Sequence, residues 1–339
     1  MRTLFFLLMA AAACTAAVDS DTRASTEMPQ ESWEVRADIP YRVQEVYPTL
    51  HQGRIYLAGG LSPDVDPATQ GISDQVYIYH PDVDQWSPGP SLPEPRHHPY
   101  LVSTGSELFS IGGFIAANGG RWSASKDILR LDEATGTWVK VAELLIPQSE
   151  TVAAYIGGQI YLASGRTPIG TENADWNHQG DVDHLQVFDP GTLTVSFGQA
   201  ASVRRNSAAG AVIDGQLYVV GGRVVDGGNV TANEVFDPVT GQWSTRAPMP
   251  QAQGGLAAAA LEGRLYVFGG EFFDREGGGV YRESWVYDPA TDAWSPIAEM
   301  PVPRHGLGAV TVGNEVFVIA GATEAGGSGT TSRVSVYTR

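Results

Sequence analysis

Apolar runs that end in a pair of small residues recur six times along the chain, and each is followed by a variable polar stretch. The six runs with their doublets are Gly53–Gly60, Ser106–Gly113, Gly158–Gly165, Gly215–Gly222, Gly263–Gly270 and Asn314–Gly321. The first residue of each doublet falls at position 59, 112, 164, 221, 269 or 320, so the spacings are 53, 52, 57, 48 and 51 residues. A period of about 50 residues with this pattern predicts a propeller of β-sheet blades.

Each unit has a second half, in which an alternating strand leads to an aromatic residue, an acidic turn and usually a tryptophan. This pattern covers Val76–Trp86, Ile128–Trp138, Glu234–Trp243 and Trp285–Trp294, whereas the third unit has Val195 in the tryptophan position. At these positions the chain resembles the kelch family, from Trp33 to the C-terminus. The resemblance implies an all-β fold, a six-bladed kelch β-propeller. It implies less about activity, because kelch propellers include enzymes, sugar binders and protein-binding scaffolds.

The ring of blades also has a predicted closure. The sixth unit ends at Ser332–Arg339 and leaves no residues for its fourth strand. Trp33, near the start of the chain, stands in the same context as Trp86 and Trp243. We therefore expect the N-terminal segment to supply the outer strand of the last blade, which pairs an otherwise open edge.

The first 30 residues predict export. Leu4–Ala13 is too short to span a bilayer but suits the apolar core of a signal peptide. We assign residues 1–14 as a signal peptide, 15–30 as a flexible tether and 31–339 as the propeller. The segment 11–14 fits ordinary cleavage after small residues, or a lipobox-like site that lipidates Cys14. We favour the lipoprotein, in the periplasm or on the outer membrane, with secretion as the alternative.

Charge and cysteine content exclude several classes of function. The formal net charge of −17 argues against nucleic acid, which requires a basic footprint. Cys14 is the only cysteine. A galactose-oxidase-type copper centre, with which kelch chains are often grouped, needs a cysteine cross-linked to a tyrosine, so it is excluded. We expect no cofactor, and contact with a membrane only through a lipid anchor.

The arginines predict an anion site. Antiparallel connectivity places the blade-entry segments and the loops after the doublets on one face, so their side chains should converge at a channel mouth. The expected ligand-binding residues there are Arg42, Arg96, His97, Arg166, Arg205, Arg223 and Arg304. Guanidinium groups match carboxylates bidentately, which favours an anionic ligand. The alternative is that these arginines pair with nearby glutamates and brace adjacent blades.

The loop Arg166–His184 in the third unit is the longest of its kind and holds two further hypotheses. Glu172, Asp175 and His178 are weak candidates for a divalent metal site. They resemble the iron motif of the kelch-type specifier proteins of plants, but each spacing is one residue shorter. The favoured role is a lid in which Trp176 and His178 contact a sugar ring.

Three functions remain open at this level. The first resembles the bacterial kelch mutarotases that interconvert anomers of N-acetylneuraminate. It needs a general acid and a general base, for which Glu45, Glu271 and His305 are the catalytic candidates. The second is a scaffold that presents its loop face to a glycan or protein partner without chemistry. The third, and least favoured, is a metal-dependent activity of the loop Glu172–His184.

Overall fold

The computed structural model describes Met1, residues 31–275 and residues 277–339. The signal peptide, the lipidation site at Cys14 and the tether predicted above lie outside the described residues, apart from Met1. The segment Glu31–Arg339 forms one unit. No helix within the described residues is long and apolar enough to cross a membrane.

Six four-stranded antiparallel sheets make up this unit, as the repeat predicts. From innermost to outermost strand, the blades are β2 (Thr49–His51), β3 (Arg54–Ala58), β4 (Val76–His80) and β5 (Gln85–Pro88); β7 (Tyr100–Ser103), β8 (Leu108–Ile111), β11 (Asp127–Asp132) and β12 (Thr137–Glu143); β13 (Val152–Ile156), β14 (Gln159–Pro168), β15 (Gln179–Asp189) and β16 (Thr194–Phe197); β17 (Ala209–Ile213), β18 (Gln216–Val220), β21 (Asn233–Asp237) and β22 (Gln242–Thr245); β23 (Ala257–Leu261), β24 (Arg264–Phe268), β27 (Ser284–Asp288) and β28 (Ala293–Ile297); and β29 (Gly308–Val312), β30 (Glu315–Ile319), β31 (Val334–Thr338) and β1 (Ser32–Arg36).

The core is divided among the six interfaces between blades. Each of six hydrophobic clusters takes its residues from two neighbouring blades; Leu57, Tyr79 and Phe317, for example, join the first blade to the sixth. The innermost strands contact one another in order around the ring, including β2 with β29. No blade buries its two faces alone, so the ring must close to complete the core.

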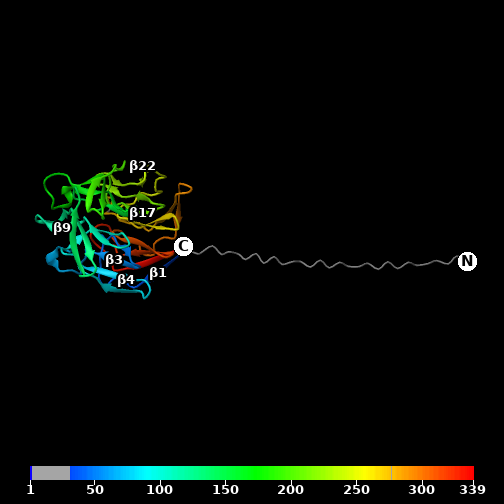
Figure 1. The fold of residues 1–339 in the computed structure, drawn as a ribbon. Coiled ribbons are helices and arrows are strands. Elements are labelled where there is room, and N and C mark those ends of the chain that lie inside the picture. Colours follow the sequence, from blue (N-terminus) through cyan, green and yellow to red (C-terminus); the bar gives the residue numbers. More distant parts are fainter. Residues whose placement is uncertain (2–30, 276) are drawn as a thin grey trace. The chain divides into compact units, whose positions relative to one another are not determined.

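The ring closes as predicted. β1 pairs antiparallel with β31, with Trp33 opposite Tyr337, and in Figure 1 the first strand lies beside the red C-terminal strand. The indole Nε1 of Trp33 donates to the carbonyl oxygen of Ala298 at 3.1 Å. The other outer-strand tryptophans donate to the preceding blade in the same way: Trp86 to Ala37, Trp138 to Pro90, Trp243 to Gln199 and Trp294 to Ala247.

Smaller elements decorate one end of the ring. They are β6 (Arg96–His97), which pairs with the hairpin β9 (Phe114–Ala117) and β10 (Gly120–Ala124); the hairpins β19 (Arg223–Val224) with β20 (Gly228–Asn229) and β25 (Glu271–Phe272) with β26 (Gly279–Val280); and the 3-10 turns η1 (Pro67–Thr69) and η2 (Trp176–His178). All of them lie in the blade-entry segments and the loops after the doublets. The loop face predicted from connectivity is therefore the built-up face of the propeller.

The doublets are small because the next blade's entry segment passes directly over them. A Cβ on Gly59 would lie 2.2 Å from the carbonyl oxygen of Arg96, and one on Gly269 would lie 2.2 Å from that of Arg304. Both glycines also have positive φ, at 67° and 64°. A larger residue would push the neighbouring blade away, which explains the most regular feature of the sequence.

Candidate functional site

A ring of left-handed residues surrounds the propeller axis. It takes one residue from each blade-entry segment, all with φ between 49° and 68°: Glu45, His98, Glu150, Ser207, Gly255 and Gly306. The amides of five of these residues donate to the carbonyl of the preceding member: Glu45 to Gly306, His98 to Glu45, Ser207 to Glu150, Gly255 to Ser207 and Gly306 to Gly255. We call these six residues the axial ring. The axial ring brings four polar side chains close to the axis, those of Glu45, His98, Glu150 and Ser207.

A cavity of about 420 Å³ lies above the axial ring on the loop face. Its lining residues are Gln44, Glu45, Leu61, His98, Arg121, Trp122, Glu150, Trp176, Arg223, Glu271, Phe273, His305, Gly326 and Gly327. Beneath the ring lie two small spaces of about 10 and 30 Å³, far smaller than the space above it. Tyr47 and Tyr100 stack further down, with ring centroids 4.7 Å apart. We call the upper space the axial cavity; it is a cup with the axial ring as its floor.

His97 lies beside the cavity in an aromatic pocket and sets the tautomers of its neighbours. It stacks on Phe114 and meets the edge of Trp122, with centroids 5.1 and 4.6 Å away. Burial lowers the pKa of His97 well below its ordinary value, so the imidazole is neutral. Its Nε2 lies 2.8 Å from the carbonyl oxygen of Arg121. That oxygen can only accept, so Nε2 carries the proton and Nδ1 of His97 is an acceptor.

The hydrogen-bond roles of His98 and Glu45 follow from the tautomer of His97. His98 Nδ1 lies 2.7 Å from His97 Nδ1, so it must donate, and His98 Nε2 lies 2.9 Å from Glu45 Oε2. Burial alone would raise the pKa of Glu45, but His98, His305 and Arg223 outweigh burial and lower that pKa to about 2. An ionised Glu45 can only accept, so His98 Nε2 donates to it. The pair places an imidazole and a carboxylate in direct contact at the wall of the cavity.

Glu271, Arg223 and His305 form a second group. Arg223 Nη1 lies 2.5 Å from Glu271 Oε1, and the Gly326 amide donates to Glu271 Oε2 at 2.7 Å. Burial alone would lower the pKa of Arg223, but Glu271 and then Glu150 raise it overall. His305 is 1% exposed, and Nδ1 faces Glu271 Oε2 at 3.4 Å. Within the described residues neither ring nitrogen of His305 makes a hydrogen bond.

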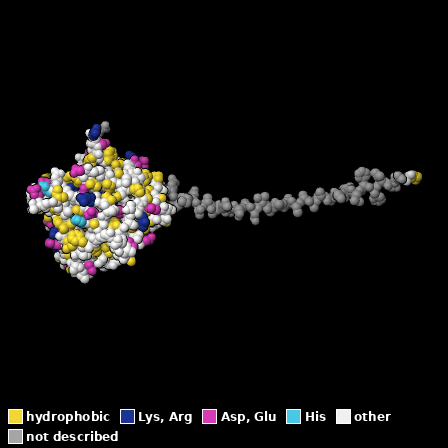
Figure 2. Space-filling model, turned by 90° about the horizontal axis from the view of Figure 1, so that it is seen from above, with side chains coloured by type: hydrophobic (Ala, Val, Ile, Leu, Met, Phe, Trp, Pro, Cys, Tyr) yellow, Lys and Arg dark blue, Asp and Glu magenta, His cyan; other side chains and the backbone are white. Residues whose placement is uncertain are grey.

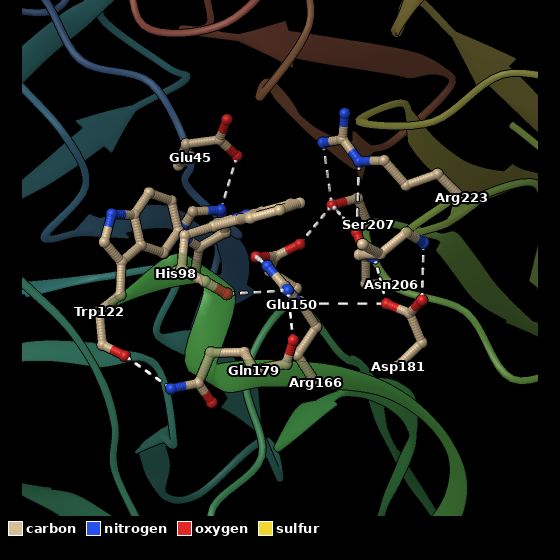
Figure 3. A network of polar contacts seen from close by, with 12 residues as sticks. Glu45, His98, Trp122, Glu150, Arg166, Gln179, Asp181, Asn206, Ser207 and Arg223 are labelled. Carbon is tan, nitrogen blue, oxygen red and sulfur yellow. Dashed lines mark hydrogen bonds and ion pairs between the residues drawn. The ribbon is translucent and has the colours of Figure 1, made fainter. Parts of the chain in front are cut away.

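Glu150 completes the polar wall. Figure 3 shows it meeting Arg223 at the hydroxyl of Ser207, which donates to Glu150 Oε2 at 2.7 Å and accepts from Arg223 Nη2 at 3.2 Å. Arg166 lies below, with Nη1 3.8 Å from Glu150 Oε1. Its guanidinium carbon lies 4.1 Å from the ring centroid of Trp176, and its Nη2 donates to the carbonyl of Trp176. Arg166 therefore holds Trp176 at the rim.

The structure corrects the predicted anion site. Arg96, Arg205 and Arg304 are fully buried between blades and do not line the axial cavity. Arg96 donates to the Gly112 carbonyl, Arg205 to that of Val219, and Arg304 to that of Val318. Gln148 and Gln253 occupy the same place in their blades and donate to Ser164 and Gly269. These residues satisfy carbonyls near the doublet of their own blade, and the carboxylates that pair with Arg96 and Arg205 also belong to the same blade, so the contacts differ from both the anion site and the bracing of adjacent blades.

Two more predicted ligand residues lie away from the cavity. The Arg42 side chain is exposed and pairs with Asp64. The register of the entry segments explains this, because Val43, not Arg42, corresponds to Arg96: each stands two positions before its axial-ring residue. His97 is covered by Trp122 and acts through His98. Of the seven predicted basic side chains, Arg223 alone lines the cavity.

The predicted metal residues do not converge. His178 Nδ1 accepts from the amides of Ala174 and Asp175, and Nε2 faces the exposed Glu172 at 3.4 Å. Within the described ranges no group of three His, Cys, Asp or Glu side chains is placed to hold a metal ion. The contacts of His178 cap the turn η2, which positions Trp176.

The three catalytic candidates do converge. Glu45, Glu271 and His305 all line the axial cavity, with His305 Nδ1 between the two carboxylates at 3.8 and 3.4 Å. The sequence argument missed His98 and Arg121, and it treated Glu150 only as a bracing partner. Aligning the entry segments on their last residue would have placed His98 and Glu150 beside Glu45.

Comparisons with known proteins agree with this fold. The model described as the KLHDC2/KLHL20/DRC7 Kelch-repeats domain matches residues 150–337, and the Kelch motif matches residues 49–93. A six-bladed propeller built from these repeats is a kelch propeller. The chain belongs to the kelch-repeat family.

Individual relatives are distant. Kelch-like protein 15 of Danio rerio is 26% identical over 273 residues, which cover 74% of this chain and 42% of that protein. Kelch-like protein terF of Aspergillus terreus is 25% identical over 294 residues, covering 85% and 63%. The chain thus spans less than two thirds of either relative. The solved structure of YjhT aligns with a TM-score of 0.74 at 17% identity, over 90% of this chain and 100% of YjhT, and shows the shared fold.

Proposed function

We propose that the axial cavity binds a sugar and exchanges its anomers by acid–base catalysis. The observation that carries this is a cup lined by the Glu45–His98 pair, by His305 beside two carboxylates, and by the rings of Trp122 and Trp176. A volume of about 420 Å³ suits a small ligand. Aromatic faces suit the apolar face of a sugar ring, and carboxylates accept hydrogen bonds from its hydroxyls.

The reaction needs two groups at one carbon. A base takes the proton of the anomeric hydroxyl, the bond between the anomeric carbon and the ring oxygen breaks, and an acid gives that oxygen a proton. We assign His305 as the base, because its Nδ1 faces both carboxylates and neither ring nitrogen makes a hydrogen bond among the described residues. The Glu45–His98 pair is the acid. The hydroxyl oxygen and the ring oxygen are bonded to the same anomeric carbon, so the acid and the base must be neighbours. His305 Nδ1 lies 3.8 Å from Glu45 Oε1, which meets this requirement.

Arg121 supports an acidic sugar. It lines the cavity, its Nη1 donates to the Gln70 carbonyl, and it has no ion pair among the residues that the structure describes. Arg223, by contrast, is occupied by Glu271, Asn206 and Ser207. A ligand carboxylate in the cavity would therefore pair with Arg121.

The test is a thermal-shift and NMR study of the propeller from Glu31 onward. N-acetylneuraminate, galacturonate and glucose are screened for binding, with and without a chelator, and NMR follows anomer exchange. Binding of an acidic sugar that Arg121→Ala weakens, with exchange above the spontaneous rate, supports the proposal; Arg42→Ala is the matched arginine control. Binding without exchange would leave a glycan-binding scaffold. No sugar binding, or a shift only with metal, would overturn the proposal.

We further propose that the protein is exported and tethered through Cys14. The support is the apolar run followed directly by the only cysteine. Metabolic labelling with a radioactive fatty acid should mark the wild-type chain and not Cys14→Ser. Unlabelled protein released from the cells would favour ordinary cleavage and secretion.

A further inference from the structure

A groove leads outward from the axial cavity between two hairpins. One wall is the hairpin β19–β20 and its turn, with Val225, Asp226 and Asn229, and the other is the start of β25–β26 with Phe272. The groove has a volume of about 490 Å³, comparable with the axial cavity itself. We call it the outer groove.

The outer groove is continuous with the axial cavity. Trp176, Arg223 and Phe273 line both spaces. Phe273 is 60% exposed and Trp176 is 38% exposed, so two large aromatic side chains stand uncovered at the junction. Uncovered aromatic surface at the edge of a formed pocket is typical of a ligand contact.

The groove also has the mixed lining that a sugar ring requires. Phe272 and Tyr281 pack together with centroids 5.1 Å apart and form an apolar floor. Asn229 donates to the Glu271 carbonyl at 2.6 Å, which ties the two hairpins together. Asp226 has no hydrogen-bond or ion-pair partner among the described residues, so its carboxylate is free to accept hydrogen bonds from hydroxyls.

We infer that the outer groove is a second sugar subsite, and that the preferred ligand is a disaccharide or longer saccharide. This rests on the proposed function. Anomer exchange requires a free anomeric centre at Glu45 and His305, so the reducing-end ring occupies the axial cavity. The next ring, on the non-reducing side, passes Trp176 and Phe273 and lies in the outer groove.

The experiment compares matched monosaccharides and disaccharides by calorimetry. The pairs are glucose with cellobiose, galacturonate with digalacturonate, and N-acetylneuraminate with its α2,8-linked dimer. For the sugar that binds, the disaccharide should bind about tenfold more tightly or better. Ala252→Trp fills the groove from the blade-entry side and should abolish this gain while the affinity for the monosaccharide is unchanged.

Controls separate the outcomes. Val239→Trp adds the same side chain at a 93% exposed turn and should leave the disaccharide gain intact. Asp226→Ala should reduce the gain without filling the groove. Retained monosaccharide binding shows that a variant is folded. Equal affinities for monosaccharide and disaccharide, or a gain that survives both groove variants, would overturn the subsite alone. Absence of binding to every sugar would overturn the proposed function together with it.

Discussion

His98 Nε2 lies 2.9 Å from Glu45 Oε2, although the residues belong to entry segments of neighbouring blades, 53 positions apart. Both occupy the axial ring, and the backbone hydrogen bond from His98 to Glu45 links the same two residues. The polar wall of the cavity is thus attached directly to the contact between the first and second blades.

Removing the histidine should remove the acid. We expect His98→Gln to lower the rate of anomer exchange by about 10²- to 10⁴-fold, the usual range for losing a general acid or base. NMR exchange spectroscopy on the sugar that binds would measure this. His80→Gln is the matched control, because His80 lies on β4, outside the cavity lining, and its side chain bonds to Ser87. A variant at position 98 with wild-type exchange would contradict the assignment.

The lowered pKa of Glu45 predicts a pH dependence of stability. The ordinary pKa is 4.5 and the folded value about 2, so ionised Glu45 stabilises the fold above pH 4.5, and this contribution is lost as the pH falls through 2. Urea unfolding from pH 2 to pH 7 should show wild type exceeding Glu45→Gln by on the order of 3 kcal/mol near neutrality, a difference that shrinks in acid. If the free energies of unfolding of wild type and Glu45→Gln changed with pH in parallel, ionised Glu45 would not be a source of stability.

The buried arginines should matter for stability and not for binding directly. Arg205→Ala leaves Glu234, 2.9 Å away and buried, without its partner, and should cost about 3–5 kcal/mol in free energy of unfolding. Arg304→Gln should cost much less than Arg304→Ala, because glutamine holds the equivalent place at Gln148 and Gln253. Chemical denaturation measures both, and an unchanged midpoint for Arg205→Ala would contradict this structural role.

Two axial-ring glycines provide a matched pair. A Cβ on Gly306 would lie 2.9 Å from Glu45 Cδ, whereas one on Gly255 would have no neighbour closer than 3.7 Å. Both have positive φ, so alanine at either position costs roughly 1 kcal/mol of backbone strain. Only Gly306→Ala should also displace Glu45 and weaken sugar binding. Equal sugar binding by the two variants would show that the packing of Gly306 against Glu45 does not affect the cavity.

Ring closure can be tested at Trp33. Its ring packs edge-on against Phe268 and Tyr337 at 5.5 and 5.4 Å. Trp33→Ala should cost about 3–5 kcal/mol, and Trp33→Phe, which loses chiefly the bond to Ala298, about 1 kcal/mol. Thermal or urea unfolding would distinguish the two variants. An unchanged stability of Trp33→Ala would mean that the pairing of β1 with β31 contributes little to the free energy of unfolding.

Figure 2 shows why surface charge is a poor guide to the site. Basic, acidic and hydrophobic side chains are interspersed on the face it presents, without a continuous basic patch. The arginines that the sequence suggested for an anion site are mostly inside the protein, where the surface does not report them. The cavity is instead defined by a few charged side chains that contact one another directly.

The sequence by itself determined the blade number, the strand order and the closure through Trp33, because these depend on patterns that repeat within the chain. Small doublets and outer tryptophans recur since each blade meets its neighbour in the same way. It also gave the catalytic candidates Glu45, Glu271 and His305, as polar residues of the entry segments and of the loops after the doublets. Only the tertiary structure decided which side chain of each segment faces the axis. A shift of one or two positions moves a residue from the axial ring to the space between blades, as Arg96 and His98 show. The residue types do not show that choice, because the backbone conformation and the packing of the next blade make it; only the register of the entry segments, aligned on their last residue, indicates it.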